Sequence, residues 1–260
     1  METEQNRRQQ GATGGNDGNR GQQFRFRQFT IRQDRCAMKV GTDGTLLGAW
    51  ASVPPSPLHP SVPPSPSPLH RILDIGTGTG LIALMMAQRF PIAKVTGIDI
   101  DDDAASQARE NVAASPFSDR IGIVCGDVKS MDTADGASFD AIVCNPPFFS
   151  DSLPSPNAQR TLARHTATLT FRQLMESAWR LLADGGELSV VIPTDGKSLL
   201  EAEAALTGFF KVRQCAVRTT PTKAPRRYLL AFRKHPAPLE TTELIIGSDA
   251  YRAMTQEFYL

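Results

Sequence analysis

Strand-like and helical segments alternate along most of this chain, and the alternation limits its fold more than any other feature. The apolar runs RILDIG and KVTGIDI are typical of buried strands, and the helical segment GLIALMMAQRF lies between them. The helical segment DDAASQARENVAAS leads to two further strands, IGIVCGD and FDAIVC. Strands joined in this way need right-handed crossovers that cover both faces of a mostly parallel sheet. The sequence therefore predicts an α/β fold.

The remaining elements complete the expected sheet. The segment FRQLMESAWRLLA predicts a helix that ends at Gly185 and Gly186, because glycine commonly stops a helix. Three strand-like runs follow it, ELSVVIP, FKVRQCAVRT and RYLLAFRK. We expect a mostly parallel seven-stranded sheet with helices on both faces and a C-terminal antiparallel hairpin.

Composition divides the chain into four parts. Residues 1–22 are polar and glycine-rich, bury too little apolar surface to offset the entropy cost of ordering, and are expected to be disordered. Residues 23–51 form an N-terminal segment that opens with alternating phenylalanine and arginine, the period of a half-buried strand. Residues 52–70 nearly repeat themselves and predict a stiff proline-rich loop. Residues 71–260 hold the predicted sheet.

The composition also limits where the protein works. No apolar run is long enough to span a membrane, and the N-terminus has no apolar stretch typical of a secretory signal. The four cysteines show no CxxC spacing, so no metal site is predicted, and Cys125 and Cys144 are expected to be buried, reduced thiols. We expect a cytoplasmic protein.

Charge is segregated along the chain. Residues 1–39 carry eight basic and four acidic side chains, and residues 197–235 carry nine and two. Residues 99–140 carry three basic and ten acidic side chains. Basic regions on both sides of an acidic middle are compatible with a bound polyanion, although a solvated surface accounts for them nearly as well.

The stretch LDIGTGTG, residues 73–80, leads from a strand into a helix through a glycine-rich turn. Gly76, Gly78 and Gly80 let the backbone approach a ligand closely. The spacing G-x-G-x-G differs from the pattern that binds dinucleotide pyrophosphates. Asp74 precedes the glycines, where its charge repels phosphate and favours an ammonium group. The alternative is a turn that binds nothing, but the strand before it and the helix after it favour a ligand site.

Two further carboxylates follow the next strands. Asp99 ends the strand after the glycines, where a doubly wound sheet uses a carboxylate to bind both ribose hydroxyls of an adenosine ligand. Asp99 could instead cap the following helix, which Asp101, Asp102 and Asp103 also precede. Asp127 ends the next strand and is a candidate acceptor for the adenine amino group.

These features resemble the class I methyltransferases over residues 71–195. The resemblance implies a Rossmann-like fold and an S-adenosylmethionine site that is acidic at its methionine and ribose ends and has no phosphate cradle.

The stretch NPPF, Asn145 to Phe148, resembles the signature of amino-methylating members of that class. A ring-conjugated amine is a poor nucleophile, and acceptors on Asn145 and Pro146 can orient its lone pair toward a methyl group. Pro147 holds the acceptors in place, and Phe148 offers a face on which a flipped-out base can stack. Enzymes with related tetrapeptides methylate adenine N6, guanine N2 or a protein glutamine, so the motif alone does not identify the methyl acceptor.

The segment QDRCAMKVGTDGTLLGAWA, residues 33–51, resembles the start of the bacterial tRNA(Val) adenine-N6 methyltransferases. The matches are Lys39 to Gly44, Leu46 to Trp50, Asn145 to Pro147, and Phe258 to Leu260, and the resemblance extends from about residue 24 to the end. It implies methyl transfer to N6 of the adenosine beside the anticodon. Phe148 stands where some relatives carry tyrosine, and the proline-rich loop replaces a shorter connection.

The resemblance also implies roles for residues outside the sheet. Lys39, Thr42 and Asp43 are expected to bind the cofactor, Thr42 and Asp43 at its methionine end, whereas residue patterns alone favour a simple β-turn at GTDG. Arg164 and His165 resemble part of the family's downstream helix–loop segment, where an RNA contact and a solvated pair account for them equally well. Lys223, Arg226 and Arg227 precede a strand, in the expected hairpin loop of the last antiparallel pair, and would add salt-dependent affinity for RNA. Nothing indicates an obligate protein partner. The alternatives are a protein-glutamine or rRNA guanine-N2 methyltransferase, or a nucleotide-binding module without catalytic activity.

Overall fold

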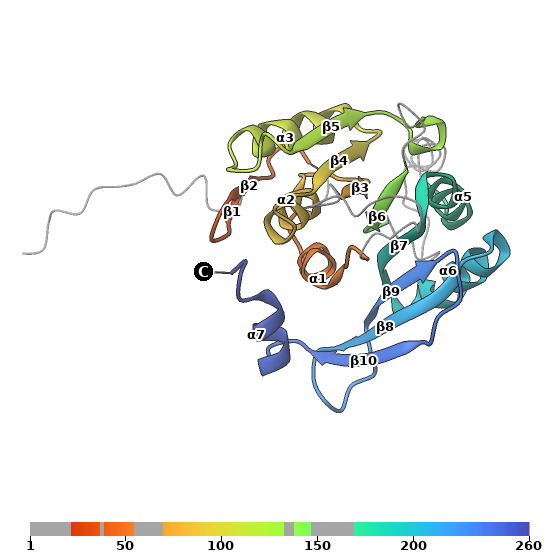
Figure 1. The fold of residues 1–260 in the computed structure, drawn as a ribbon. Helices are drawn as coiled ribbons and strands as arrows, with labels where there is room; N and C mark the ends of the chain where they lie inside the picture. Colours follow the sequence, from red (N-terminus) through yellow and green to blue (C-terminus); the bar gives the residue numbers. More distant parts are fainter. Residues whose placement is uncertain (1–21, 37–38, 55–69, 133–137, 147–168, 260) are drawn as a thin grey trace, which may run out of the picture.

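The computed structural model describes residues 22–36, 39–54, 70–132, 138–146 and 169–259, and it confirms the predicted α/β fold (Figure 1). Its main sheet has the strand order β10-β8-β9-β7-β6-β3-β4-β5. Neighbouring strands are parallel except at β9, which is antiparallel to β7 and β8. The strands are β3 (Arg71–Ile75), β4 (Lys94–Asp99), β5 (Ile121–Cys125), β6 (Phe139–Cys144), β7 (Leu182–Pro193), β8 (Phe210–Arg218), β9 (Arg227–Arg233) and β10 (Glu240–Ile245).

Within the described residues the main sheet has eight strands, so the prediction of seven is wrong by one. The predicted C-terminal antiparallel hairpin is present as β8 and β9. The additional strand is β10, which pairs with β8 at the edge of the sheet. Its sequence, ETTELI, is mostly polar and mostly exposed. It therefore lacks the apolar run by which a buried parallel strand is recognised in a sequence.

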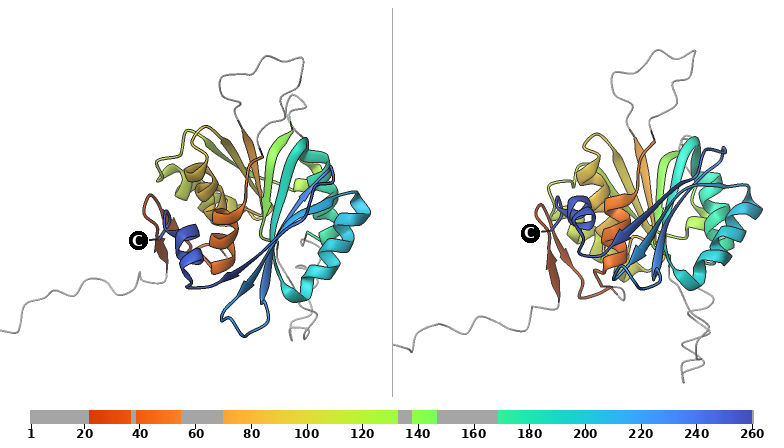
Figure 2. Two further views of the ribbon diagram at one scale, coloured as in Figure 1. Left: turned by 60° about the horizontal axis from the view of Figure 1, so that its bottom comes forward. Right: turned by 90° about the horizontal axis from the view of Figure 1, so that it is seen from below.

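Helices cover both faces of the sheet, as predicted. α1, α2, α3 and α7 lie on one side and α5 and α6 on the other (Figure 2). One hydrophobic core forms on each face, the first around Leu84 and Met85 and the second around Leu174 and Leu188. The helices are α1 (Thr42–Trp50), α2 (Leu81–Arg89), α3 (Asp102–Ala113), α5 (Phe171–Leu181), α6 (Thr194–Thr207) and α7 (Asp249–Thr255), with the 3₁₀ turn η2 (Val128–Ser130).

The end of α5 differs from the prediction. The helix ends at Leu181 and the chain enters β7 at Leu182, so Gly185 and Gly186 lie in a strand and do not stop the helix. A Cβ atom at Gly186 would lie 2.9 Å from the carbonyl oxygen of Asp140. This glycine therefore serves close packing between β7 and β6, at a point where the register of the two strands shifts.

The segment GTDG is not a β-turn, because Thr42 begins helix α1. Gly44 and Gly48 made a helix hard to recognise here, since glycine disfavours helix interiors. Both glycines face α2, where a Cβ atom at Gly48 would lie 2.7 Å from Met85 Sδ and one at Gly44 would lie 3.1 Å from Leu81 Cδ2. They allow α1 to pack directly against α2.

The N-terminal segment and the C-terminus lie side by side (Figure 2). A two-stranded antiparallel sheet, β1 (Gln23–Arg25) and β2 (Thr30–Arg32), opens the described chain. The Arg27 N–H donates to the carbonyl oxygen of Phe258 at 2.9 Å, and the Phe26 and Tyr259 rings stack with centroids 6.0 Å apart. The chain ends thus cover the first core together. The predicted disordered tail, apart from Gln22, and residues 55–69 of the predicted proline-rich loop lie outside the described residues.

The position of each strand in the sheet decides how its cysteine is placed. Cys144 lies on central strand β6 and is buried, whereas Cys125 ends edge strand β5 and is exposed, contrary to the prediction. Within the described ranges, every helix is too short or too polar to cross a membrane.

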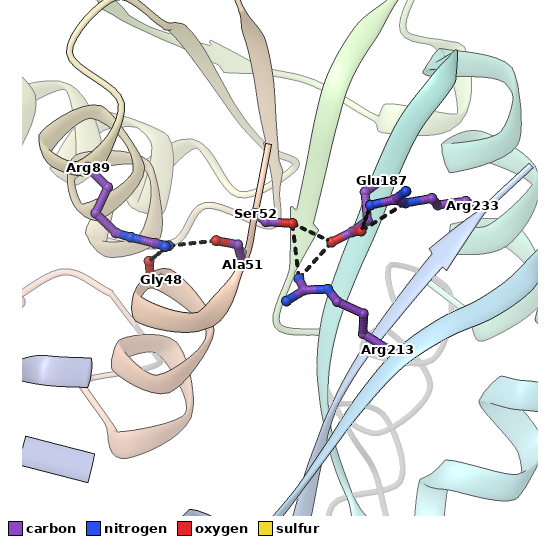
Figure 3. Close-up of polar contacts among 7 residues, drawn as sticks. All are labelled: Gly48, Ala51, Ser52, Arg89, Glu187, Arg213 and Arg233. Carbon is purple, nitrogen blue, oxygen red and sulfur yellow. Dashed lines mark hydrogen bonds and ion pairs between the residues drawn. The ribbon is translucent and has the colours of Figure 1, made fainter. Parts of the chain in front are cut away.

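A buried carboxylate, Glu187, joins the middle of β7 to three other segments (Figure 3). Its Oε2 accepts two hydrogen bonds from Arg233, at 2.8 and 3.0 Å. Its Oε1 accepts from Arg213 at 2.7 Å and from the Ser52 hydroxyl at 2.8 Å. Because Ser52 follows α1, this carboxylate fastens the end of the N-terminal segment to β8 and β9.

A second arginine contact holds the C-terminal end of α1 (Figure 3). Arg89 donates to the carbonyl oxygens of Gly48 at 2.9 Å and Ala51 at 2.6 Å. A cation at the C-terminal end of a helix also interacts favourably with the helix dipole. The Arg213 guanidinium lies 4.1 Å from the centre of the Trp50 ring, so α1 is fixed at this end by charge and by packing.

Replacing Glu187 with alanine should destabilise the fold by about 3 kcal/mol, because Arg213 and Arg233, whose side chains are 20% and 35% exposed, lose their fully buried partner. Urea unfolding followed by tryptophan fluorescence would measure the loss. Glu243→Ala is the matched control, since Glu243 pairs with Arg218 but its side chain is 59% exposed, and it should cost less than about 1 kcal/mol. Equal losses in the two variants would show that the Glu187 contacts do not anchor the segment.

Candidate active site

A cavity of about 560 Å³ opens at the carboxyl ends of the central strands. Crevices of this kind, at the carboxyl ends of strands in an open α/β sheet, are the usual ligand sites of such folds. The walls come from the glycine-rich turn after β3, the ends of β4 to β7, the first residue of β9, and Cys36 and residues 39–44 of the N-terminal segment. Of the predicted catalytic and cofactor-binding residues in the described ranges, nine line it: Lys39, Thr42, Asp43, Gly76, Gly78, Asp99, Asp127, Asn145 and Pro146.

The glycine-rich turn owes its shape to backbone conformations that favour glycine. Gly76, Gly78 and Gly80 have φ angles of 69°, 55° and 80°. The N–H groups of Gly76 and Thr77 donate to the carbonyl oxygen of Ile98, and that of Gly78 donates to Asp99 Oδ2 at 2.8 Å. These three N–H groups are used inside the protein, so they are not directed at a phosphate.

Asp74 lies beneath this turn, does not line the cavity, and is fully buried. Its Oδ2 accepts from the Thr77 hydroxyl at 2.7 Å and from the Ala83 N–H at 3.1 Å, and thereby fastens the turn to the start of α2. Burial raises the pKa of Asp74 to about 7, against the opposing effect of these two hydrogen bonds. Gly80 also lies outside the cavity wall, at the N-terminal cap of α2.

Asp99 joins the turn to the start of α3. Its Oδ2 accepts from Gly78 and its Oδ1 accepts from the Asp101 N–H at 3.0 Å. The cap of α3 is Asp101, whose side chain accepts from the N–H groups of Asp103 and Ala104. Because a carboxylate has about four acceptor sites, Asp99 retains acceptor capacity toward the cavity that it lines.

Asp127 lines the cavity two residues after the end of β5, the strand that pairs with β4. Its side chain accepts from the Lys129 N–H at 2.9 Å, which makes Asp127 the N-cap of η2, and it lies 3.2 Å from Lys129 Nζ. Ile100 and Val128 add apolar surface on this side, and 52% of the Ile100 side chain remains exposed at the cavity. A flat apolar ring between these residues, with its polar edge near Asp127, fits this chemistry.

Asn145 and Pro146 follow β6 and line the same cavity beside the glycine-rich turn. Pro146 is buried and Asn145 is half-buried. Cys144 precedes them, and burial, with contributions from Asp74 and Asp99, raises the pKa of its thiol well above the usual range. A thiolate nucleophile is therefore disfavoured at this position. Pro147 and Phe148 lie outside the described residues.

The N-terminal segment is held over the cavity by two buried amides of α3. The Asn111 side chain accepts from the Arg32 N–H and donates to the carbonyl oxygens of Arg32 and Thr79. Gln107 accepts from the Arg35 N–H at 3.1 Å. The same residues of α3 thus bind the N-terminal segment and the glycine-rich turn, which brings Thr42 and Asp43 to the cavity.

The predicted RNA-binding residues separate in the structure. Lys223 and Arg226 are exposed in the loop between β8 and β9, at the carboxyl edge of the sheet. Arg227 begins β9, lines the cavity and forms an ion pair with Asp43. It is therefore not part of an exposed loop, and burial lowers its pKa from the usual value. Arg164 and His165 lie outside the described residues.

Several cavity residues carried no recognisable signal in the sequence. Cys36, Leu169 and Pro193 line the cavity but belong to no motif. Ile100 could have been noticed, because it follows Asp99 directly and extends an apolar run into an acidic segment. No group of three or more His, Cys, Asp or Glu side chains within the described ranges could hold a metal ion.

The sheet with one antiparallel strand, together with an acidic, glycine-lined cavity without a phosphate cradle, defines a small methyltransferase domain. Residues 62–221 match the family described as Methyltransferase small domain. The chain is similar in fold to a crystal structure from Agrobacterium tumefaciens described as a predicted O-methyltransferase, with a TM-score of 0.59 and 21% identity over 83% of this chain and 96% of that one.

The chain belongs to the family of the tRNA1(Val) (adenine(37)-N6)-methyltransferases. It is 47% identical to the protein of that name from Phocaeicola vulgatus, over 91% of this chain and 97% of the relative. It is 44% identical to that from Bacteroides thetaiotaomicron, with the same coverage, and 46% identical to one from Porphyromonas gingivalis, over 91% and 94%. The resemblance carried by residues 33–51 and by Asn145 to Pro147 is thereby confirmed.

Replacing Asp74 with asparagine should change how stability depends on pH. The pKa is about 7 in the folded protein and about 3.9 in an unfolded chain, so between pH 4 and 7 the folded state holds a proton that the unfolded state has lost. Wild-type stability therefore loses this contribution as the pH rises, and Asp74→Asn does not. The free energy of unfolding of the variant, relative to wild type, should rise by about 4 kcal/mol across this window.

Urea unfolding at a series of pH values measures this difference. Asp119→Asn is the control, because that side chain is 76% exposed, and its curve should run parallel to the wild-type curve. A constant offset between Asp74→Asn and wild type from pH 4 to 7 would contradict the assignment.

Proposed function

We propose that this protein transfers a methyl group from S-adenosylmethionine to N6 of an adenine in tRNA, at the adenosine beside the anticodon of tRNA(Val). The main structural support is that Asn145 and Pro146 line the same cavity as Asp99 and the glycine-rich turn. Relatives that are 44–47% identical carry the name tRNA1(Val) (adenine(37)-N6)-methyltransferase. We further propose that it works in the cytoplasm and needs no obligate protein partner.

The residues of the cavity fit this cofactor. Bound S-adenosylmethionine supplies an electrophilic methyl group on a positively charged sulfur atom. Asp99 would bind the ribose hydroxyls, and Asp127 would accept from the adenine amino group between the apolar surfaces of Ile100 and Val128. The internal use of the Gly76, Thr77 and Gly78 N–H groups disfavours a phosphate-bearing ligand and suits an adenosine ligand that has none.

The hydrogen-bond acceptors after β6 would favour an amine as the group that receives the methyl. The Asn145 side-chain oxygen and the Pro146 carbonyl oxygen would accept the two hydrogens of the adenine amino group, so that its lone pair points at the methyl group. The bound cofactor would supply the methyl group, with its sulfur as the leaving group, and the amine nitrogen would give up one proton to solvent. These acceptors are fixed before reaction, and such preorganised groups stabilise charge where it develops in the transition state.

The charge distribution supports an RNA contact at the carboxyl edge of the sheet. Lys223 and Arg226 are exposed in the loop between β8 and β9, on the edge at which the cavity opens. The acidic residues 99–140 would repel a phosphate backbone. RNA would therefore approach over the β8–β9 loop.

Nucleoside mass spectrometry tests the proposed activity. Unmodified tRNA1(Val) incubated with the protein and S-adenosylmethionine should gain one N6-methyladenosine, and a transcript with adenosine 37 replaced by guanosine should gain none. Methylation of both transcripts, or of guanine N2, would contradict the proposal.

Asn145→Ala should slow methyl transfer by about 10² to 10³ while leaving cofactor binding close to wild type, because its acceptor acts only as the amine attacks. Asn145→Asp should be less damaging, since a carboxylate still accepts hydrogen bonds. Single-turnover methylation of unmodified tRNA measures both rates. A wild-type rate in Asn145→Ala would remove this residue from the reaction.

Asp99→Ala should weaken the binding of S-adenosylhomocysteine by about 1.5 to 3 kcal/mol, the usual contribution of a hydrogen bond to a charged group. Titration calorimetry measures the affinity, and thermal unfolding shows whether the loss of the Gly78 and Asp101 contacts unsettles the turn. Asp102→Ala is the control, because Asp102 lies on the same helix start and does not line the cavity. Unchanged affinity in Asp99→Ala would exclude a ribose contact.

A further inference from the structure

The cavity contains one ion pair that the proposed reaction does not use. Arg227, the first residue of β9, pairs with Asp43 in the first turn of α1. Both residues line the cavity, and their side chains are 23% and 32% exposed. A partly exposed pair of this kind contributes little to stability. Its position in the cavity wall therefore suggests a role in ligand binding.

This pair lies away from the adenosine end of the cavity. Asp99 and Asp127 stand at the ends of β4 and β5, whereas Arg227 stands beside Pro193 at the end of β7. Gly44, next to Asp43, packs against Leu81 at the start of α2, where the glycine-rich turn ends. A ligand whose ribose lies at Asp99 and which crosses the turn therefore extends its other end toward Asp43 and Arg227.

We infer that Arg227 and Asp43 together recognise the amino-acid end of the cofactor, with the guanidinium binding its carboxylate and Asp43 binding its ammonium group. The inference rests on the proposed function in taking S-adenosylmethionine as the ligand and in placing its ribose at Asp99. It makes Arg227 a specificity-determining residue for the cofactor and not an RNA-binding residue.

The charges of this end of the cavity match a zwitterion. An α-amino acid carries one carboxylate and one ammonium group on the same carbon, and the pair offers one cation and one anion from two different elements. A guanidinium has five N–H donors, so Arg227 can retain Asp43 while binding a second carboxylate. Both ligand charges then have an opposite charge within the cavity, and neither is buried unpaired.

Helix α1 adds to the carboxylate side. Its N-cap is Gly41, which makes no side-chain capping bond, and Gly41, Thr42 and Gly44 all line the cavity. The N–H groups in the first turn of a helix carry partial positive charge and favour an anion. Arg227 and this helix end would therefore both favour the ligand carboxylate, while the negative charge of Asp43 would favour the ligand ammonium group.

The experiment compares three cofactor analogues by titration calorimetry. The first is S-adenosylhomocysteine, the second its decarboxylated form and the third its deaminated form. Wild-type protein should bind S-adenosylhomocysteine about ten to a hundred times more tightly than either analogue, the range of a charge-assisted contact. Arg227→Met should lose this factor for S-adenosylhomocysteine and keep its affinity for the decarboxylated form. Asp43→Asn should bind S-adenosylhomocysteine more weakly by the same factor and keep its affinity for the deaminated form.

Two controls separate recognition from structure. Arg226→Met removes the neighbouring exposed cation, which does not line the cavity, and should leave all three affinities unchanged. Arg227→Lys should recover part of the preference for the carboxylate. An equal loss for all three ligands in Arg227→Met, or unchanged affinities with weaker tRNA binding, would overturn the inference. Failure of wild-type protein to bind S-adenosylhomocysteine would instead refute the proposed cofactor.

Discussion

Two carboxylates hold the turn between β3 and α2, and the cavity depends on that turn. Asp74 binds it from below through Thr77 and Ala83, and Asp99 binds it from the side through Gly78. The positive φ angles of the turn glycines bring its backbone to the floor of the cavity without side chains in the way. Without these bonds the strand ends would still meet, but the surface that faces the ligand would not be defined.

The remaining wall comes from a segment that lies far away in the sequence. Asn111 and Gln107 hold residues 32–35, and α1 then packs on α2 through glycines. At the other end of α1, Arg89 and the Glu187 contacts fix the helix to the sheet. Helix α1 is therefore held at its C-terminal end by structural contacts, whereas its N-terminal end, with Asp43, lines the cavity.

The distribution of charge in the cavity follows from this construction. The end near β4 and β5 carries Asp99 and Asp127, whereas the end near α1 carries both signs, in Asp43 and Arg227. Asn145 lies between these ends, at the close of β6, and β6 is next to β3 in the sheet. In the function that we propose, a neutral adenosine would lie at one end of the cavity, a zwitterion at the other and the reacting amine near the middle.

Local pattern in the sequence was sufficient to predict the alternating strands and helices, the glycine-rich turn, and the motif residues from Asp99 to Pro146, because strand ends in a parallel sheet converge on one edge. It could not reveal α1, whose Gly44 and Gly48 disfavour a helix until α2 packs against them. Nor could it reveal β10, which is polar, or show that Arg227 lines the cavity and does not lie in a surface loop. These features depend on contacts between distant segments, and only the tertiary structure brings such segments together.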